Sequence, residues 1–181
     1  MKHIYVALSA LIFSLAANAQ TYMQVGYTST DYSESVISSG TAYKVAASPT
    51  AVRGILGYEV NPNFSIEGML ALGLSDSSIS VSGISTPVNL KIDNLYGFYG
   101  KPKFQVSPEM EVFARISYAH GKATASYQST SASISESSLS YGVGMSYAIN
   151  KQMSINIDAM TYYDKNSTSA TGTTVGIGYK F

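Results

Sequence analysis

Residues 174–181, TVGIGYKF, alternate strictly between two kinds of side chain. Positions 175, 177, 179 and 181 are apolar or aromatic, whereas positions 174, 176, 178 and 180 are small or polar. Because successive side chains of a β-strand point to opposite faces, the stretch predicts a strand with one apolar and one polar face.

Seven upstream segments show the same alternation, so we predict an all-β fold of eight antiparallel strands. Examples are Met23 and Val25 in the first segment and Leu70 and Leu72 in the third. The predicted strands cover residues 21–32, 51–60, 64–74, 92–106, 110–122, 139–149, 153–163 and 174–181.

The connections between these strands alternate in length. Turns rich in Asn, Pro and Ser fall at 60–64, 106–110 and 149–153, whereas Ser/Thr-rich stretches occupy 33–49, 76–89, 125–136 and 166–170. Short periplasmic turns and long extracellular loops are typical of outer-membrane barrels. We therefore predict an eight-stranded antiparallel up-and-down transmembrane β-barrel in the bacterial outer membrane, with extracellular loops and periplasmic termini.

The chain carries few charges for a water-soluble protein, 12% against a usual value of about 25%. A secreted ligand-binding barrel would also alternate, but its water-facing side would carry many mixed charges. The 11 basic and 11 acidic residues form no basic cluster, which argues against nucleic-acid binding.

The ionisable residues of the strands fall on the polar face, which we predict to line the lumen. Eight strands leave an interior only wide enough for side chains to fill, and a buried unpaired charge is costly. We therefore favour a structural charge network and keep a narrow channel for small solutes or ions as the alternative. The predicted network consists of Arg53, Glu59, Glu67, Asp93, Lys101, Lys103, Glu111, Arg115, Asp158 and Lys180.

The apolar face is predicted to meet lipid and to carry aromatic residues at both ends, as rings prefer the headgroup level. We assign Ile92 to this face, together with two aromatic girdles. One comprises Tyr58, Phe64, Phe104, Tyr147 and Phe181, and the other comprises Tyr27, Tyr118, Tyr141 and Tyr163.

Residues 1–19 have the layout of a secretory signal peptide. A short basic start at Lys2 and His3 precedes a mostly apolar run over 4–15, which is shorter than the roughly 20 residues of a spanning helix. Ala17 and Ala19 provide a small-x-small cleavage pattern, so we expect cleavage before Gln20 and one mature barrel domain over 20–181.

The strand pattern over 20–181 and the motif Thr174-x-Gly176-x-x-Tyr179-x-Phe181 resemble the small outer-membrane barrels of the OmpX and Ail type and, more loosely, the membrane domain of OmpA. The resemblance implies that the motif is an assembly signal for the barrel-assembly machinery. It also implies that periplasmic chaperones, outer-membrane lipid and lipopolysaccharide are partners. Surface attachment or host-protein contact through the loops is a further implication, although the loop lysines here are scattered.

His120 is the one candidate for acid–base chemistry in the mature chain. Some eight-stranded outer-membrane lipid A deacylases use a His, a nearby Ser and a carboxylate, but Gly121 and Lys122 follow His120, so the expected Ser two residues on is missing. We predict a non-enzymatic protein without metal or cofactor and keep a lipid-modifying enzyme as the third hypothesis.

The loops are the predicted place of function. Segments 78–82 and 132–135 keep the alternation, so we expect a sheet that projects from the cell and offers a free edge to a partner strand. The leading hypothesis is a monomeric surface barrel with an envelope structural role, an adhesive role, or both.

Overall fold

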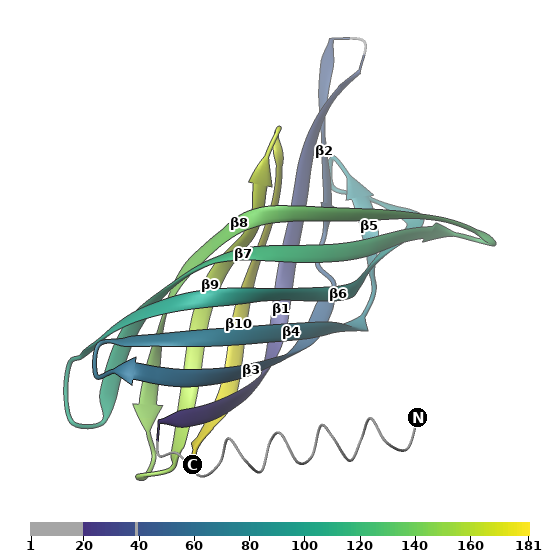
Figure 1. Ribbon diagram of the computed structural model, residues 1–181. Coiled ribbons are helices and arrows are strands. Elements are labelled where there is room, and N and C mark those ends of the chain that lie inside the picture. Colours follow the sequence, from purple (N-terminus) through teal and green to yellow (C-terminus); the bar gives the residue numbers. More distant parts are fainter. Residues whose placement is uncertain (1–19, 39) are drawn as a thin grey trace.

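The computed structural model describes residues 20–38 and 40–181, and the predicted signal peptide with Ala17 and Ala19 lies outside this part. The described part is built from strands (Figure 1). They are β1 (Thr21–Ser38), β2 (Thr41–Ala47), β3 (Thr50–Asn61), β4 (Phe64–Ser75), β5 (Ser77–Val81), β6 (Ile84–Gln105), β7 (Met110–Tyr127), β8 (Thr130–Ala148), β9 (Met153–Lys165) and β10 (Thr168–Lys180). Within these residues no helix is long and apolar enough to cross a membrane.

Eight of the strands close into a ring in the order β1-β3-β4-β6-β7-β8-β9-β10, and β10 pairs again with β1. Every pairing is antiparallel, and the closing seam runs from Tyr22 opposite Lys180 to Glu34 opposite Thr168. The predicted eight-stranded antiparallel up-and-down barrel is therefore confirmed.

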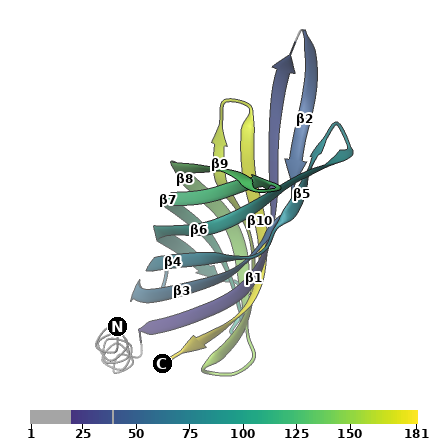
Figure 2. The same ribbon diagram turned by 90° about the vertical axis from the view of Figure 1, so that its right-hand side faces the viewer.

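The two ends of the ring differ. At one end, here called the short-turn end, brief turns join β3 to β4, β7 to β6 and β8 to β9, and the C-terminus lies there too (Figure 2). At the other, the long-hairpin end, the hairpins β1–β2, β5–β6, β7–β8 and β9–β10 rise above the ring.

Most residues of the three longest predicted loops are strands, so their assignment as loops is wrong. β2 and β5 pair with each other and with β1 and β6, and β7 pairs with β8 as far as Tyr127 and Thr130. The predicted continuation of the strands is confirmed for 78–81 and 132–135, whereas Ser82 lies in the turn and the pairing of β5 with β6 shifts register between Ser78 and Ser80. Ser and Thr occur in turns as well as in strands, so composition alone did not distinguish these strands from loops. Cross-strand hydrogen bonds stabilise them.

Two β-bulges reverse assignments made from the alternation. A bulge between Ile92 and Asn94 places Ile92 opposite Ala123, and Ile92 packs against the interior cluster instead of facing outward. A second irregularity places Tyr163 opposite Ala170, which lies opposite Tyr32 on the inward face. Tyr163 therefore faces inward, and its assignment to the outward aromatic girdle is wrong. A bulge adds one residue to one strand, so the two-residue period changes face at that point.

The outward face of the ring is apolar along its middle. Phe98 is 83% exposed, and Leu70, Ile116 and Val143 are also exposed. The predicted girdle members at the short-turn end include the exposed Tyr58, Phe104 and Tyr147, and those towards the long hairpins include the exposed Tyr27, Tyr118 and Tyr141.

Candidate functional site

The half of the lumen nearer the long hairpins is filled by an apolar cluster. Ile92 and Leu95 pack against its buried members, which are Ala51, Ile55, Met69, Ala71, Tyr99, Met160 and Tyr162. An eight-stranded barrel leaves an interior only wide enough for side chains, and this cluster occupies that space on this side.

Below this cluster, Arg115 connects two carboxylates from opposite parts of the ring. Its Nε and Nη2 donate hydrogen bonds to Glu67, at 2.6 and 3.1 Å, and its Nη1 donates one to Asp158 at 2.7 Å. Arg53 forms a second ion pair with Asp158 and donates a 3.1 Å hydrogen bond to the Tyr162 hydroxyl. These five side chains are buried, so each charge is compensated by a partner instead of by bulk solvent.

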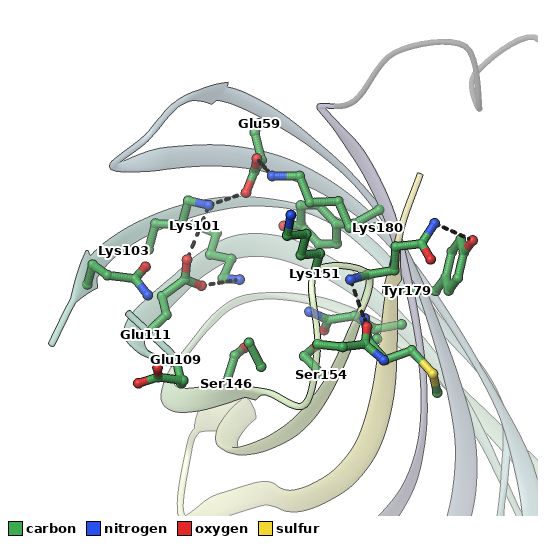
Figure 3. Close-up of a pocket in the computed structure, with 18 residues that line it drawn as sticks. Glu59, Lys101, Lys103, Glu109, Glu111, Ser146, Lys151, Ser154, Tyr179 and Lys180 are labelled. Atoms are coloured by element: carbon green, nitrogen blue, oxygen red, sulfur yellow. Dashed lines mark hydrogen bonds and ion pairs between the residues drawn. The ribbon is translucent and has the colours of Figure 1, made fainter. Parts of the chain in front are cut away.

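Towards the short-turn end the ion pairs continue as an alternating series (Figure 3). Lys101 lies 2.9 Å from Glu111, and Lys103 lies 3.2 Å from Glu111 and 2.5 Å from Glu59. Glu59 also pairs with Lys180, which is 43% exposed. The series borders a cavity of about 170 Å³ at the mouth of the ring.

The structure brings nine of the ten predicted lumen residues into this one series. Lys101 also lies 4.0 Å from Glu67, which joins the two halves. Asp93 is the exception, because the bulge before Asn94 turns it towards Thr124, whose hydroxyl donates a 2.7 Å hydrogen bond to it.

Sequence reasoning missed three uncharged members. Tyr22 donates a 2.6 Å hydrogen bond to Glu67, and Gln24 accepts one of 2.9 Å from Arg115. Both lie on the inward face of β1. Their even positions in the first predicted strand, on its polar face, could have placed them in the lumen. Tyr162 continues the inward alternation of Asp158 and Met160 on β9, so its place on the polar face was the signal there too.

At the long-hairpin end, β8 separates from β9. The two strands pair from Tyr141 to Ala148 of β8 and no further, whereas β8 stays paired with β7 up to Thr130. Figure 1 shows the β7–β8 hairpin leaving the ring in a different direction from the β9–β10 hairpin. Residues 130–140 of β8 are therefore a free edge of the sheet.

The backbone groups on this edge can be assigned. The Ser137 carbonyl points away from β7, because it accepts a 3.3 Å hydrogen bond from Lys165 of β9. In an antiparallel pair, alternate residues point their N–H and C=O groups away from the partner. Ser131, Ser133 and Ser135 therefore present theirs to the free edge.

The two faces of the sheet that projects beyond the ring differ in most of their residues, although Glu34 and Glu136 share the concave face and Ile37 lies on the convex one. Cross-strand partners place Val36 with Tyr43, Val45 with Val81, and Ala123 with Ile134 on the concave face. Ile134 is 64% exposed there. The opposite, convex face carries Ser, Thr and Lys side chains, among them Ser133, Ser135 and Lys122.

His120 lies on the outward face between two serines of the neighbouring strand. Its Nδ1 is 2.8 Å from Ser137 Oγ, and its Nε2 is 2.9 Å from Ser135 Oγ. The sequence lacks a serine two residues after His120, but the neighbouring strand β8 places two serines beside its ring. Among the described residues no carboxylate hydrogen-bonds this ring, and none of their His, Asp and Glu side chains gather in groups that could hold a metal ion.

The C-terminal motif forms the last strand beside β1. Thr174 lies opposite Thr28, and Gly176 lies opposite Gly26. Tyr179 and Phe181 contact each other edge to face, with ring centroids 5.3 Å apart. The motif thus lies at the closing seam, and its role as an assembly signal stays a prediction.

Comparison with known proteins agrees with this architecture. The family model described as outer membrane protein beta-barrel domain matches residues 5–181. No curated protein sequence matches the chain.

Several solved structures are similar. Ail of Yersinia pestis is 19% identical, with a TM-score of 0.62, covering 89% of this chain and 97% of Ail. Neisserial surface protein A is 13% identical, with a TM-score of 0.68 and coverages of 90% and 97%. The N-terminal barrel of Pseudomonas aeruginosa OprF is 12% identical, with a TM-score of 0.58 and coverages of 90% and 98%. At these identities the likeness concerns the fold.

Proposed function

Since the chain belongs to the outer membrane protein beta-barrel family, we propose that it is a non-enzymatic surface barrel that contacts other proteins through its projecting sheet. The long-hairpin end faces the outside of the cell and the short-turn end faces the periplasm, as is usual for bacterial outer-membrane barrels. The ring itself anchors the sheet in the outer membrane.

The free edge of β8 is the observation that carries this proposal. An extended segment of a partner can add to such an edge as a new strand, because main-chain hydrogen bonds supply affinity. Soluble proteins usually protect exposed edges with charges or Pro, yet residues 130–140 contain one charged residue, Glu136, and no Pro.

The concave face adds selectivity. A strand seated beside β8 would place alternate side chains next to Ile134 and Ala132, which are exposed and apolar. The preferred partner segment therefore alternates apolar and polar residues, with its apolar side towards this face.

A closed lumen supports the structural part of the proposal. The apolar cluster and the buried part of the ion-pair series occupy the middle of the interior, which favours an anchor over a conduit. Within the described part of the chain the hydrogen-bond partners of His120 are two serines, which favours an interfacial histidine over an acid–base catalyst.

The edge can be tested without shortening a hairpin. Ser133→Pro removes an N–H that points to the free edge and leaves the hydrogen bonds to β7 in place, and edge strands tolerate Pro. The matched control is Ser133→Ala, which keeps the N–H. We expect cells that display Ser133→Pro to lose attachment to surfaces coated with serum or matrix proteins, and cells with Ser133→Ala to retain it. Equal attachment of both variants would contradict strand addition at this edge.

A further inference from the structure

Gln20, the residue that follows the predicted cleavage site, is held by β3 through both its backbone and its side chain. Its carbonyl accepts a 2.7 Å hydrogen bond from the N–H of Glu59, and its Oε1 accepts a 2.5 Å hydrogen bond from the Tyr58 hydroxyl. Gln20 is exposed at the short-turn end, one residue before β1 begins. Cleavage before Gln20 therefore leaves an N-terminal glutamine that is fixed to the barrel.

An N-terminal glutamine contains both reactants of a cyclisation. Its neutral α-amine attacks its own Cδ, so an N–Cδ bond forms and a lactam ring closes. The Cδ–Nε2 bond breaks, and Nε2 takes the proton that the amine loses and leaves as ammonia. The reaction needs no oxidant, reductant or second substrate, so the mature chain by itself can carry it out.

The Tyr58 hydroxyl contacts the atom that gains negative charge in this reaction. Attack at Cδ moves electrons onto Oε1, and a donor that is already bound there stabilises the oxyanion. The Glu59 N–H holds the backbone of the same residue, so fewer rotations have to be frozen before the amine reaches Cδ. The two contacts therefore favour cyclisation in the folded barrel over cyclisation in the unfolded chain.

The charges beside Gln20 favour an uncharged N-terminus. Glu59, which contacts the Gln20 backbone, pairs with both Lys103 and Lys180, so these three side chains carry a net positive charge (Figure 3). An additional ammonium group at this place is repelled by that charge, whereas a neutral amine or a lactam is not. The neutral amine is the form that attacks Cδ.

We propose that the mature chain begins with pyroglutamate at position 20, formed from Gln20 with the Tyr58 hydroxyl as the oxyanion donor. The inference rests on the predicted cleavage before Gln20. It is independent of the free edge of β8, which lies at the opposite end of the barrel. The lactam removes a positive charge from the mouth of the ring and also removes the free amine that aminopeptidases require.

Protein extracted from outer membranes provides the first test. We expect its N-terminal peptide to start at position 20, to have the mass of the encoded peptide less one ammonia, and to resist stepwise N-terminal degradation. Gln20→Ala, which has no side-chain amide to attack, is expected to keep a free amine.

The second test measures the contribution of Tyr58. Gln20 is freed by proteolytic removal of an N-terminal tag, the chain is refolded in detergent micelles, and ammonia loss is followed by intact mass against time. The folded wild type is expected to lose ammonia faster than the same chain in urea. Tyr58→Phe keeps the ring without the donor and is expected to slow the folded chain about fivefold, the effect of one net hydrogen bond. The matched control Tyr147→Phe, at another exposed tyrosine near the short-turn end, is expected to keep the wild-type rate.

Three outcomes would overturn the proposal. The first is outer-membrane protein with an intact glutamine at position 20 or with an N-terminus at another residue. The second is an equal rate in the folded and the unfolded wild type. The third is an equal rate for Tyr58→Phe and Tyr147→Phe, which would make the Tyr58 contact a clamp on the strand alone. The mobility of unheated samples in gels confirms that each variant has refolded, so that a slower rate reports the chemistry.

Discussion

Arg115 of β7 donates two hydrogen bonds to Glu67 of β4, although 48 residues separate them in the chain. The same guanidinium group reaches Asp158 of β9, so one buried side chain joins three strands across the lumen. The ion-pair series that starts here ends at the partly exposed Lys180, where the C-terminal strand meets the short-turn end.

Replacing Arg115 by Met is expected to destabilise the barrel strongly. The substitution leaves Glu67 and Asp158 buried with fewer cations, and removing one partner of a buried pair costs about 3–5 kcal/mol. Urea unfolding of the purified protein, followed by tyrosine fluorescence, measures the change. Lys180→Met is the control, because its partly exposed ion pair contributes about 0–1 kcal/mol. Similar losses in the two variants would show that the buried series has no special role.

The wild-type protein is expected to form no steady open channel in planar lipid bilayers. The interior is occupied by the Tyr99 and Met160 cluster on one side and by the ion-pair series on the other. Single-channel recording, with a known porin as the positive control, tests this expectation. Long-lived conductance steps of uniform size would establish the channel alternative.

Gly176→Ala is expected to impair closure of the ring. A Cβ at Gly176 would lie 2.5 Å from the Val25 carbonyl oxygen and 2.8 Å from Gly26 Cα, and backbone cannot move aside easily. Gly54→Ala is the control, since a Cβ there meets nothing nearer than 3.8 Å. Refolding yield, read from the mobility of unheated samples in gels, should fall for Gly176→Ala alone. Equal yields would mean that the seam between β1 and β10 can relax.

Phe181→Ala is expected to reduce assembly in cells more than folding in vitro. If the C-terminal motif is an assembly signal, the amount of inserted barrel falls while the purified chain still refolds in detergent. Phe104→Ala is the control, because Phe104 is also an exposed aromatic residue near the short-turn end. A parallel loss of assembly in both variants would assign Phe181 an ordinary girdle role.

The alternation in the sequence predicted the ring strands well, because a strand with one face towards lipid and one towards the lumen has a strict period of two. It failed at Ile92 and Tyr163, where a bulge adds a residue and no local signal marks it. The assignment of 33–49 to a loop also failed along β2, because polar side chains on a projecting sheet resemble a loop in composition.

The sequence by itself determined the number of ring strands, their direction and the inward position of most charges, since each follows from side-chain period and turn chemistry. Only the tertiary structure decided which charges meet, because Arg115 and Glu67 are brought together by ring closure and strand stagger. Tertiary pairing also created the free edge at β8 and the displacement of Asp93. These features depend on cross-strand register, which is set by contacts between segments far apart in the chain.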